Sequence, residues 1–316
     1  MEVDDIRKVA VLGAGLLGHG IALVYAHGGY TVTLLDLERE ALDRALIRIR
    51  QNLDLLVAKE ATTSERAEAA LANISTTTDL AEACADADFV TEAVPEVLDL
   101  KKEMFAKADE LCPGRTILAS NTSTQRITEL ASATARPDRV VGTHWMRSPY
   151  IRPLVEVIPG ERTSEETVRT ATALIERLGK VPVLAKDIPA FIVNRLQAGV
   201  IREALVLLEQ GISKEDIDNA WKNQLGLNYC LAGPFEVMDG IGLDIMYMAC
   251  HYLAAVFDDP AWQPTGALAE LFEAGHYGLK TGKGFYDYTG LSADDIMRER
   301  DERLLDLVRY LGLDSG

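Results

Sequence analysis

Two charged side chains on neighbouring expected strands have the types and positions that proton transfer requires. His144 follows an expected strand at 140–143, and ligands bind at the carboxyl ends of strands in open α/β sheets. An imidazole there can act as a general base near neutral pH. Glu156 lies in the next expected strand, 154–158, where a carboxylate among apolar residues is costly unless it is paired. Paired with His144, it would fix the tautomer and stabilise the imidazolium; otherwise it lies on an exposed strand face.

Two uncharged polar residues could contact the reacting oxygen. Ser123 lies in the segment SNTST, directly after another expected strand, although Ser and Thr in such loops are commonly caps or turns. Asn194 lies near the start of an apolar helix, and its alternative role is that of a satisfied amide where two domains meet. Both residues are therefore candidates for hydrogen bonds to a substrate.

A glycine motif predicts the cofactor. Gly13-x-Gly15-x-x-Gly18 follows the strand expected at 8–12 and precedes a helical pattern. Such glycines permit a tight turn, close approach of the backbone to a pyrophosphate, and close packing of the helix on the sheet. Asp36, at the end of the next expected strand, can accept hydrogen bonds from ribose hydroxyls and would repel a 2′-phosphate, so NAD is favoured over NADP. The expected cofactor contacts are the three glycines, Leu16 and Leu17 between them, and Asp36.

The order of the elements predicts two domains. Further apolar segments at 89–94, 116–119, 140–143, 154–158 and 181–184 alternate with helical or turn-rich stretches, which is typical of a mostly parallel sheet covered on both faces. Two amphipathic patterns at about 38–72 predict an inserted helical hairpin. After Lys186 the pattern becomes helical. We therefore expect an α/β Rossmann-type NAD-binding domain at 1–187 and an all-α domain at 188–316, which binds substrate and mediates dimerisation.

Composition excludes several classes of partner. A formal net charge of −17 repels polyanions, so neither nucleic acid nor an anionic membrane surface is an expected partner. No apolar run reaches the roughly 18 residues that a membrane span needs, and residues 1–8 lack the pattern of a signal peptide, which predicts a cytoplasmic protein. The four cysteines are scattered without CxxC spacing, so neither a disulfide framework nor a metal site is indicated.

Over nearly its whole length the chain resembles the L-3-hydroxyacyl-CoA dehydrogenase family. This NAD-dependent family includes 3-hydroxybutyryl-CoA dehydrogenases and the related carnitine and gulonate dehydrogenases. The resemblance rests on seven segments in order: GAGLLGHGIA at 13–22, EAVPE at 92–96, SNTS at 120–123, His144 with LVEVIPG at 154–160, FIVNRL at 191–196, GPFE at 233–236 and KTGKGFY at 280–286.

The resemblance implies a reaction in fatty acid metabolism. His144 and Glu156 match the family's catalytic pair, and Ser123 and Asn194 match its substrate contacts. The implied reaction is proton abstraction from a secondary 3-hydroxyl by His144 while hydride leaves the same carbon for NAD, which produces a ketone. Family contacts to the cofactor fall at positions that match Glu96, Lys101, Ser123 and Lys280. The family's helical domain commonly mediates dimerisation, which implies a homodimer.

Departures from the family pattern bear on the substrate. Where the family has His-Phe-Phe-Asn-Pro-Pro, this chain has HWMRSP at 144–149, so that Arg147 replaces an asparagine. Arg147 could clamp a carboxylate, as could Arg152, which would suit a small free hydroxy acid, as in carnitine or gulonate dehydrogenases. Of the basic residues that bind coenzyme A on the hairpin, only Lys59 persists. The leading expectation is an acyl-CoA oxidoreductase, with a free hydroxy acid enzyme second and a non-catalytic NAD-binding protein, like the lens crystallins of this family, third.

Overall fold

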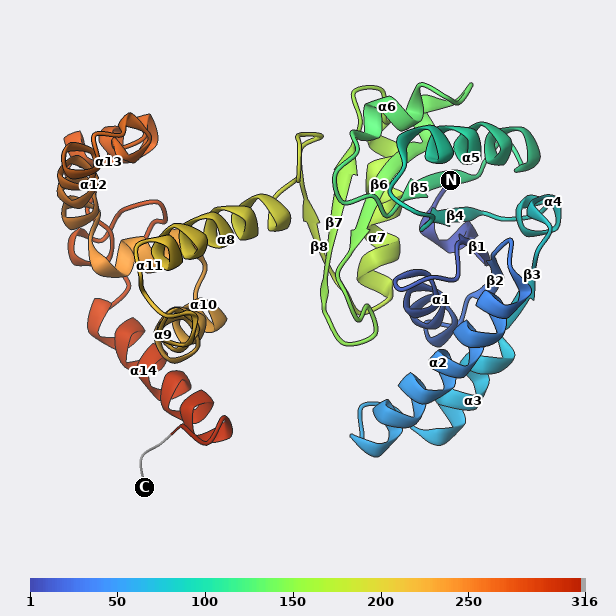
Figure 1. Ribbon diagram of the computed structural model, residues 1–316, viewed down its shortest axis with the longest axis horizontal. Coiled ribbons are helices and arrows are strands. Elements are labelled where there is room, and N and C mark those ends of the chain that lie inside the picture. The colour runs from blue at the N-terminus through green and yellow to red at the C-terminus, as the bar shows by residue number, and fades with distance from the viewer. Residues whose placement is uncertain (314–316) are drawn as a thin grey trace. The chain divides into compact units, whose positions relative to one another are not determined.

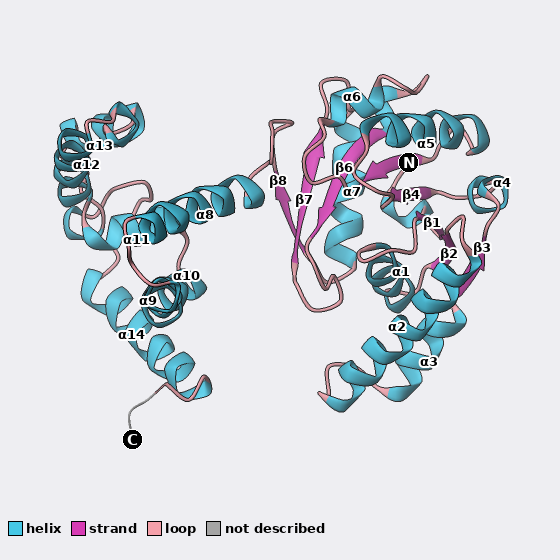
Figure 2. Ribbon diagram, viewed as in Figure 1, coloured by secondary structure: helices cyan, strands magenta, loops and turns pink. Residues whose placement is uncertain are grey.

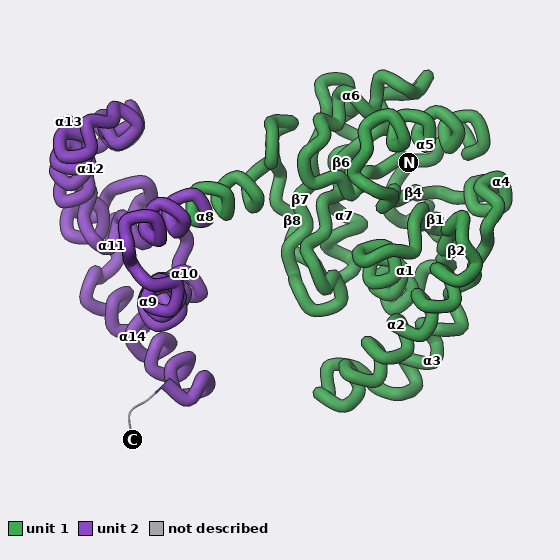
Figure 3. Tube along the Cα trace, in the orientation of Figure 1, with its two compact units in different colours: residues 1–200 green, residues 201–316 purple. Residues whose placement is uncertain are grey.

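The structure is a computed structural model in which residues 1–313 are described. It divides into two compact units, Met1–Val200 and Ile201–Gly316, called the N-terminal and C-terminal units below (Figure 3). The division falls inside one helix, α8 (Val193–Glu209), which begins six residues after the boundary expected at residue 187. The domain boundary at 187 stays a prediction.

The N-terminal unit is built on one eight-stranded sheet with the order β3-β2-β1-β4-β5-β6-β7-β8 (Figure 1). Strands β1 to β6 are parallel, β7 is antiparallel to β6, and β8 is parallel to β7. The expected mostly parallel sheet is thereby confirmed. The strands are β1 (Lys8–Leu12), β2 (Thr31–Leu35), β3 (Ile74–Thr77), β4 (Phe89–Glu92), β5 (Ile117–Ser120), β6 (Val140–Trp145), β7 (Leu154–Pro159) and β8 (Val181–Leu184).

Helices cover both faces of this sheet and create two separate cores (Figure 2). One core joins the sheet to α1, α2, α3 and α7, and the other joins it to α4, α5 and α6. Central strands are therefore buried on both sides, which is why they read as continuous apolar runs. The helices are α1 (Gly18–His27), α2 (Arg39–Ala58), α3 (Ser64–Ala72), α4 (Leu80–Cys84), α5 (Leu98–Leu111), α6 (Ile127–Ala131) and α7 (Glu165–Arg177).

One strand and one strand end differ from the expectation. The edge strand β3 has the polar sequence ISTT, which contains no apolar run. It forms because its backbone pairs with β2. Strand β6 continues beyond residue 143, so that His144 lies within it and pairs with β7. Both differences arise from strands distant in sequence, which supply backbone hydrogen bonds that the local sequence pattern does not predict.

The expected hairpin at about 38–72 is formed by α2 and α3. The apolar face of α2 buries Leu42, Ile49 and Leu53, at the spacing of an amphipathic helix. Thr63 caps α3 by accepting a hydrogen bond from the backbone N–H of Arg66. Lys59 lies at the C-terminal end of α2 with its side chain exposed.

The C-terminal unit is helical, as expected for an all-α domain. A buried carboxylate, Asp239, accepts hydrogen bonds from the backbone N–H groups of Phe285 and Tyr286 and from the hydroxyl of Tyr288, each at 3.0 Å. Asp239 thus ties the segment that carries Lys280 to α11. The helices are α9 (Lys214–Ala220), α10 (Gly226–Leu231), α11 (Pro234–Ile241), α12 (Leu243–Phe257), α13 (Gly266–Glu273) and α14 (Ala293–Tyr310).

Among residues 1–313, no single helix is both long enough and apolar enough to cross a bilayer. The bent pair of α11 and α12 together has the length and composition of a membrane span.

Candidate active site

A large pocket in the N-terminal unit opens at the carboxyl ends of β1, β2, β4, β5 and β6. Its volume is about 1040 Å³, at the upper end of the range found for small-molecule and cofactor sites. Most of the residues predicted from the sequence to bind cofactor or substrate line it: Gly13, Gly15, Leu16, Leu17, Asp36, Glu96, Lys101, Ser123, His144, Arg147 and Asn194.

The glycine turn between β1 and α1 is shaped to leave one side open. Gly13 has a φ of 107°, and a Cβ added at Gly18 would lie 1.7 Å from the carbonyl oxygen of Gly13, so neither position accepts a side chain. An added Cβ at Gly15 would meet no atom within 4 Å. His19, which the sequence reasoning did not single out, contacts the carbonyl oxygen of Gly15 through Nδ1 at 2.7 Å. The turn therefore has the open backbone that a pyrophosphate requires at the start of a helix.

Asp36 lies at the end of β2 and also shapes this turn. Its Oδ2 accepts a hydrogen bond from the backbone N–H of Ala14 at 2.8 Å, and its Oδ1 accepts one from the N–H of Glu38 at 3.2 Å. Each carboxylate oxygen has a second lone pair. Asp36 can therefore hold the glycine turn and still accept hydrogen bonds from a ribose in the adjoining pocket.

His144 and Glu156 form a buried pair. The antiparallel register of β6 and β7 places the two residues directly opposite each other, and His144 Nδ1 lies 2.6 Å from Glu156 Oε2. His144 is 5% exposed and Glu156 is fully buried. Burial opposes ionisation of Glu156, but its hydrogen bonds with His144 and with two backbone N–H groups hold the pKa of this carboxyl below its usual range. Since the carboxylate accepts, Nδ1 carries the proton and Nε2 is left as a base.

The Ser123 hydroxyl lies at the free nitrogen of His144, and Asn194 contacts the backbone of Ser123. Ser123 Oγ is 3.2 Å from His144 Nε2, and Asn194 Nδ2 donates to the carbonyl oxygen of Ser123 at 3.4 Å. Asn194 belongs to the first turn of α8, in the part of that helix that the N-terminal unit contains. The structure thus brings Ser123, His144 and Asn194 together in one pocket, while Glu156 is buried and paired with His144.

The second oxygen of Glu156 fixes the backbone that leads into α8. Glu156 Oε1 accepts hydrogen bonds from the N–H groups of Ile192 at 2.8 Å and Val193 at 3.0 Å. Just before them, Ala190 and Phe191 have φ values of 65° and 49°, a left-handed conformation that non-glycine residues adopt at a cost. One carboxylate therefore orients both the imidazole and the segment that carries Asn194.

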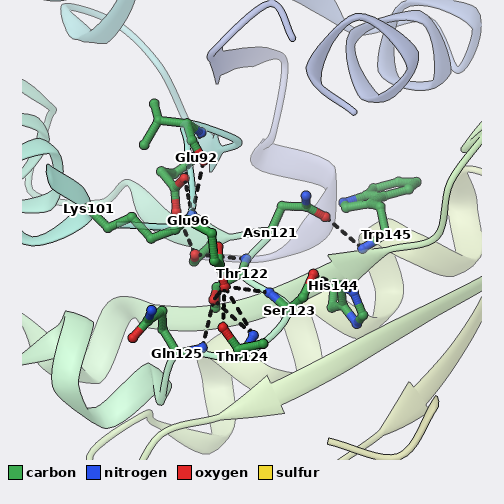
Figure 4. A network of polar contacts seen from close by, with 12 residues as sticks. Glu92, Glu96, Lys101, Asn121, Thr122, Ser123, Thr124, Gln125, His144 and Trp145 are labelled. Atoms are coloured by element: carbon green, nitrogen blue, oxygen red, sulfur yellow. Dashed lines mark hydrogen bonds and ion pairs between the residues drawn. The ribbon is translucent and has the colours of Figure 1, made fainter. Parts of the chain in front are cut away.

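A second charged cluster consists of the buried side chains of Glu92 and Lys101 with the partly exposed Glu96, and is called the Lys101 cluster below (Figure 4). The ammonium of Lys101 donates to Glu92 Oε1 at 2.7 Å and to the carbonyl oxygen of Val94 at 3.3 Å, and lies 3.1 Å from Glu96 Oε2. Burial opposes ionisation of Glu96, but hydrogen bonds from Thr122 and Thr124 and the charge of Lys101 lower its pKa to about 2. Protein oxygens thus match all three N–H bonds of Lys101, a residue predicted to contact the cofactor.

Four predicted basic contacts differ in their placement. The guanidinium of Arg147 borders the pocket and is exposed, as is that of Arg152, and the ion pairs within residues 1–313 involve neither of them. Lys59 is not part of the pocket lining. Lys280 belongs to the C-terminal unit, where it forms an ion pair with Asp244. Their binding roles stay predictions.

The sequence reasoning missed the polar residues that support this pocket. Asn121 Oδ1 accepts a hydrogen bond from the backbone N–H of Trp145 at 2.8 Å, which links the end of β5 to the end of β6. Glu92 is a carboxylate at the end of the apolar strand β4. A carboxylate in an apolar strand is the pattern that identified Glu156, and the same pattern in β4 predicts a paired Glu92.

Comparisons with known proteins identify the family of the chain. The family model described as the NAD binding domain of 3-hydroxyacyl-CoA dehydrogenase matches residues 8–188, and the C-terminal domain of the same family matches residues 191–288. The chain is 40% identical over 285 residues to a Bacillus subtilis protein named probable 3-hydroxybutyryl-CoA dehydrogenase, a match that covers 90% of this chain and 98% of that protein.

Two crystal structures are also similar. A 3-hydroxyacyl-CoA dehydrogenase from Archaeoglobus fulgidus has a TM-score of 0.82 and 37% identity, covering 98% of this chain and 100% of that one. A 5-formyl-3-hydroxy-2-methylpyridine 4-carboxylic acid 5-dehydrogenase has a TM-score of 0.75 and 33% identity, covering 97% of this chain and 99% of that one. With both domains matched in order and this identity sustained along the chain, the protein belongs to the 3-hydroxyacyl-CoA dehydrogenase family.

Proposed function

We propose that this chain oxidises the secondary 3-hydroxyl of an L-3-hydroxyacyl-CoA to a ketone with NAD as the hydride acceptor. The observation that carries the proposal is the His144–Glu156 pair, whose free Nε2 lies beside Ser123 in the pocket that also contains the glycine turn. Relatives at about 40% identity bear the names of such dehydrogenases. The same groups serve the reverse reduction.

The proposed roles follow from hydrogen-bond geometry. With Nδ1–H donated to Glu156, Nε2 of His144 accepts the proton of the substrate hydroxyl, and the carboxylate stabilises the imidazolium that results. Ser123 Oγ, at 3.2 Å from Nε2, is placed to hydrogen-bond the same oxygen, and Asn194 approaches from α8. These residues orient the hydroxyl so that proton loss can accompany departure of the hydride.

The residues present fit a dinucleotide. The open backbone at Gly15 would receive the pyrophosphate, with Leu16 and Leu17 beside it, and Asp36 would accept the ribose hydroxyls. NAD supplies the hydride acceptor when it is bound. In this proposal Glu96 and Ser123 also contact the cofactor. The family contact matched by Lys280 stays a prediction from the sequence.

The direct test is NADH formation by the purified protein with NAD and L-3-hydroxybutyryl-CoA, compared with a panel of free hydroxy acids that includes carnitine and gulonate. Turnover of the thioester at a kcat/KM far above that of every free acid is the expected result. Turnover of free acids alone would replace the substrate. Tight binding of NAD without turnover of any compound would favour the non-catalytic, crystallin-like alternative.

A free hydroxy acid is a second candidate substrate, favoured by Arg147 and Arg152. Both residues border the pocket, and no ion pair among residues 1–313 involves them. Guanidinium groups bind carboxylates bidentately. The similar pyridine carboxylic acid dehydrogenase is named for a substrate that carries a carboxyl group. If this candidate holds, Arg147→Met raises KM for the acid about 10- to 100-fold, the effect expected for losing a charge-assisted hydrogen bond.

The matched control for that variant is Arg162→Met. Arg162 is also exposed but lies outside the pocket lining, so its loss should leave KM unchanged. Lys59→Met, by contrast, should raise KM for a thioester and not for a free acid, because the free acid has no coenzyme A moiety to contact the hairpin.

We also propose a homodimer formed through the C-terminal unit. Helix α12 carries an exposed apolar stripe at helical spacing, Ile245, Met248, Tyr252 and Val256, whose side chains are 48–67% exposed. Light scattering at micromolar concentration should give twice the chain mass, and Met248→Glu with Tyr252→Glu should give a monomer. A wild-type monomer would contradict the proposal. The cytoplasmic location and the role in fatty acid metabolism stay predictions, the former open to cell fractionation.

A further inference from the structure

We propose that Glu92 is a positioning residue: it acts through Lys101 and Glu96 to hold the Ser123 turn, residues 121–124, in the geometry that both cofactor and substrate require. The inference rests on the proposed function, because it assigns the Ser123 turn to that reaction. Glu92 itself touches neither ligand in this proposal. It is the buried anchor from which the polar contacts of the pocket are built (Figure 4).

Glu92 is unusually buried for an ionisable side chain. It is 1% exposed, and its oxygens accept from Lys101 Nζ at 2.7 Å, from the N–H of Val94 at 2.7 Å and from Ser120 Oγ at 2.6 Å. Burial raises the pKa of this carboxyl, although Lys101 and the hydrogen bonds act in the opposite direction. A buried ion pair is a poor source of net stability compared with apolar side chains of the same size. The sheet core alone would therefore not require a charge at this position.

Lys101 passes the restraint from Glu92 to Glu96. Its side chain is 1% exposed, and its ammonium bridges Glu92 Oε1 at 2.7 Å and Glu96 Oε2 at 3.1 Å. Glu96 is 38% exposed at the side chain and borders the pocket, and Lys101 is the only partner of its Oε2 among residues 1–313. The position of Glu96 is thus set by a cation whose own position Glu92 sets.

Glu96 in turn binds the Ser123 turn with its other oxygen. Glu96 Oε1 accepts from the backbone N–H groups of Ser123 and Thr124, each at 3.1 Å, and from the hydroxyls of Thr122 and Thr124. Ser120 Oγ, which donates to Glu92, also accepts from the N–H of Thr122 at 3.1 Å. Glu92 therefore restrains the turn by two routes, one through Ser120 and one through Lys101 and Glu96.

The restraint matters because Ser123 Oγ lies 3.2 Å from His144 Nε2, within the range where small shifts change a hydrogen bond. Reacting groups must be held to within roughly 0.5 Å of the productive geometry. Glu92 itself does not react in the proposed mechanism. Its loss should therefore shift the Ser123 turn and leave the reacting groups chemically intact.

The test compares Glu92→Gln with Asp88→Asn. Asp88 precedes the same strand, β4, and is also a buried carboxylate: it accepts from the N–H groups of Arg7 and Lys8 and pairs with Arg115, away from the pocket. Both variants remove a buried charge with little change in shape. A purely structural role predicts that they lower the melting temperature alike and leave ligand parameters unchanged.

The positioning role predicts a difference between the two variants. Glu92→Gln should raise the Kd for NADH, measured by fluorescence titration, about threefold to tenfold and lower kcat about tenfold or more, the scale of losing a supporting residue. Asp88→Asn should leave both parameters within twofold of the wild type. Equal melting temperatures with unchanged Kd and kcat in both variants would overturn the proposal.

A double-mutant cycle with Glu96→Gln tests the route. If Glu92 acts chiefly through Glu96, the effect of Glu92→Gln on Kd and kcat should shrink to less than about threefold in the Glu96→Gln background, whereas independent sites give additive free energies. Additive effects would overturn the route through Lys101. The Kd for NADH needs no hydroxyacyl substrate, so a wild type that turns over no thioester would end the proposed function while the cycle still decides the role of Glu92.

Discussion

The His144–Glu156 pair and the Lys101 cluster both contain buried ionisable side chains, and both contact the Ser123 turn, but they present different groups to the pocket. In the first, Glu156 accepts hydrogen bonds from His144 and from two backbone N–H groups, and Nε2 of the imidazole is left free of any carboxylate. In the second, every N–H bond of Lys101 meets a protein oxygen. A buried charge must be compensated in either case. Only the His144–Glu156 pair has a nitrogen lone pair at the pocket, beside Ser123 Oγ, so only this pair can accept a proton from a substrate.

The two clusters therefore have different tasks in one pocket: the first carries the base, and the second positions the Ser123 turn. Glu156 lies on β7 and meets His144 through strand register, which leaves the imidazole as the variable part. Glu92 lies on β4 and meets Lys101 from α5, which leaves the Ser123 turn as the part that is held. Variants that remove a central residue from each cluster should therefore fail in different ways.

The largest expected effect on turnover is that of His144→Ala. Loss of the base should lower kcat about 10²- to 10⁴-fold. Glu156 keeps its hydrogen bonds from Ile192 and Val193, so the melting temperature and the Kd for NADH should stay near those of the wild type. Steady-state kinetics and fluorescence titration measure the two outcomes. Near-normal turnover would remove His144 as the base and erase the contrast between the clusters.

The largest expected effect on stability is that of Lys101→Met. Without the ammonium, Glu92 becomes a buried carboxylate without a cation, which should lower the free energy of unfolding by about 3–5 kcal/mol. Lys107→Met on the exposed face of the same helix is the matched control: its pair with Glu103 is exposed, so the loss should stay below about 1 kcal/mol. Urea denaturation decides, and equal losses in the two variants would refute a structural role for the buried pair.

Glu156→Gln should have an intermediate effect. The amide offers one oxygen to the three donors that the carboxylate accepts, and it no longer balances an imidazolium. Turnover should fall roughly 10²-fold, less than for His144→Ala, because the base itself remains. Asp187→Asn, which also removes a carboxylate that accepts backbone N–H groups but lies outside the pocket, should leave kcat unchanged. A wild-type kcat in Glu156→Gln would show that catalysis does not need the Glu156 carboxylate.

The smallest expected effect is an acid-stability difference at Glu96. Its pKa is lowered from the usual 4.5 to about 2, so its ionised contacts add stability above pH 4.5, and this contribution is lost as pH falls through that window. Glu96→Gln should therefore be less stable than the wild type near neutral pH, with a smaller loss of stability between about pH 4.5 and about pH 2. Thermal melts across that range measure it. Parallel curves for the two proteins would show that the turn does not depend on an ionised Glu96.

Local pattern was sufficient for much of the fold. The strand at residues 8–12, the glycine turn and the helix after it follow from an apolar run, three glycines and helical spacing, all within one segment of chain. Strand β3 could not be foreseen in the same way, because its sequence ISTT is polar and its hydrogen bonds come from β2. The extension of β6 through His144 likewise depends on β7, which lies across a loop.

For the site, the sequence by itself determined which groups are available: an imidazole, a carboxylate in an apolar strand, and a serine after another strand, each with chemistry that its type dictates. The tertiary structure establishes which of these groups contact one another. The antiparallel register sets Glu156 opposite His144, and the left-handed backbone at Ala190 and Phe191 turns Ile192 and Val193 toward the same carboxylate. It also decided that Lys101 lies between two carboxylates. Distances between side chains depend on strand order and helix packing, which residues far apart in the chain determine together.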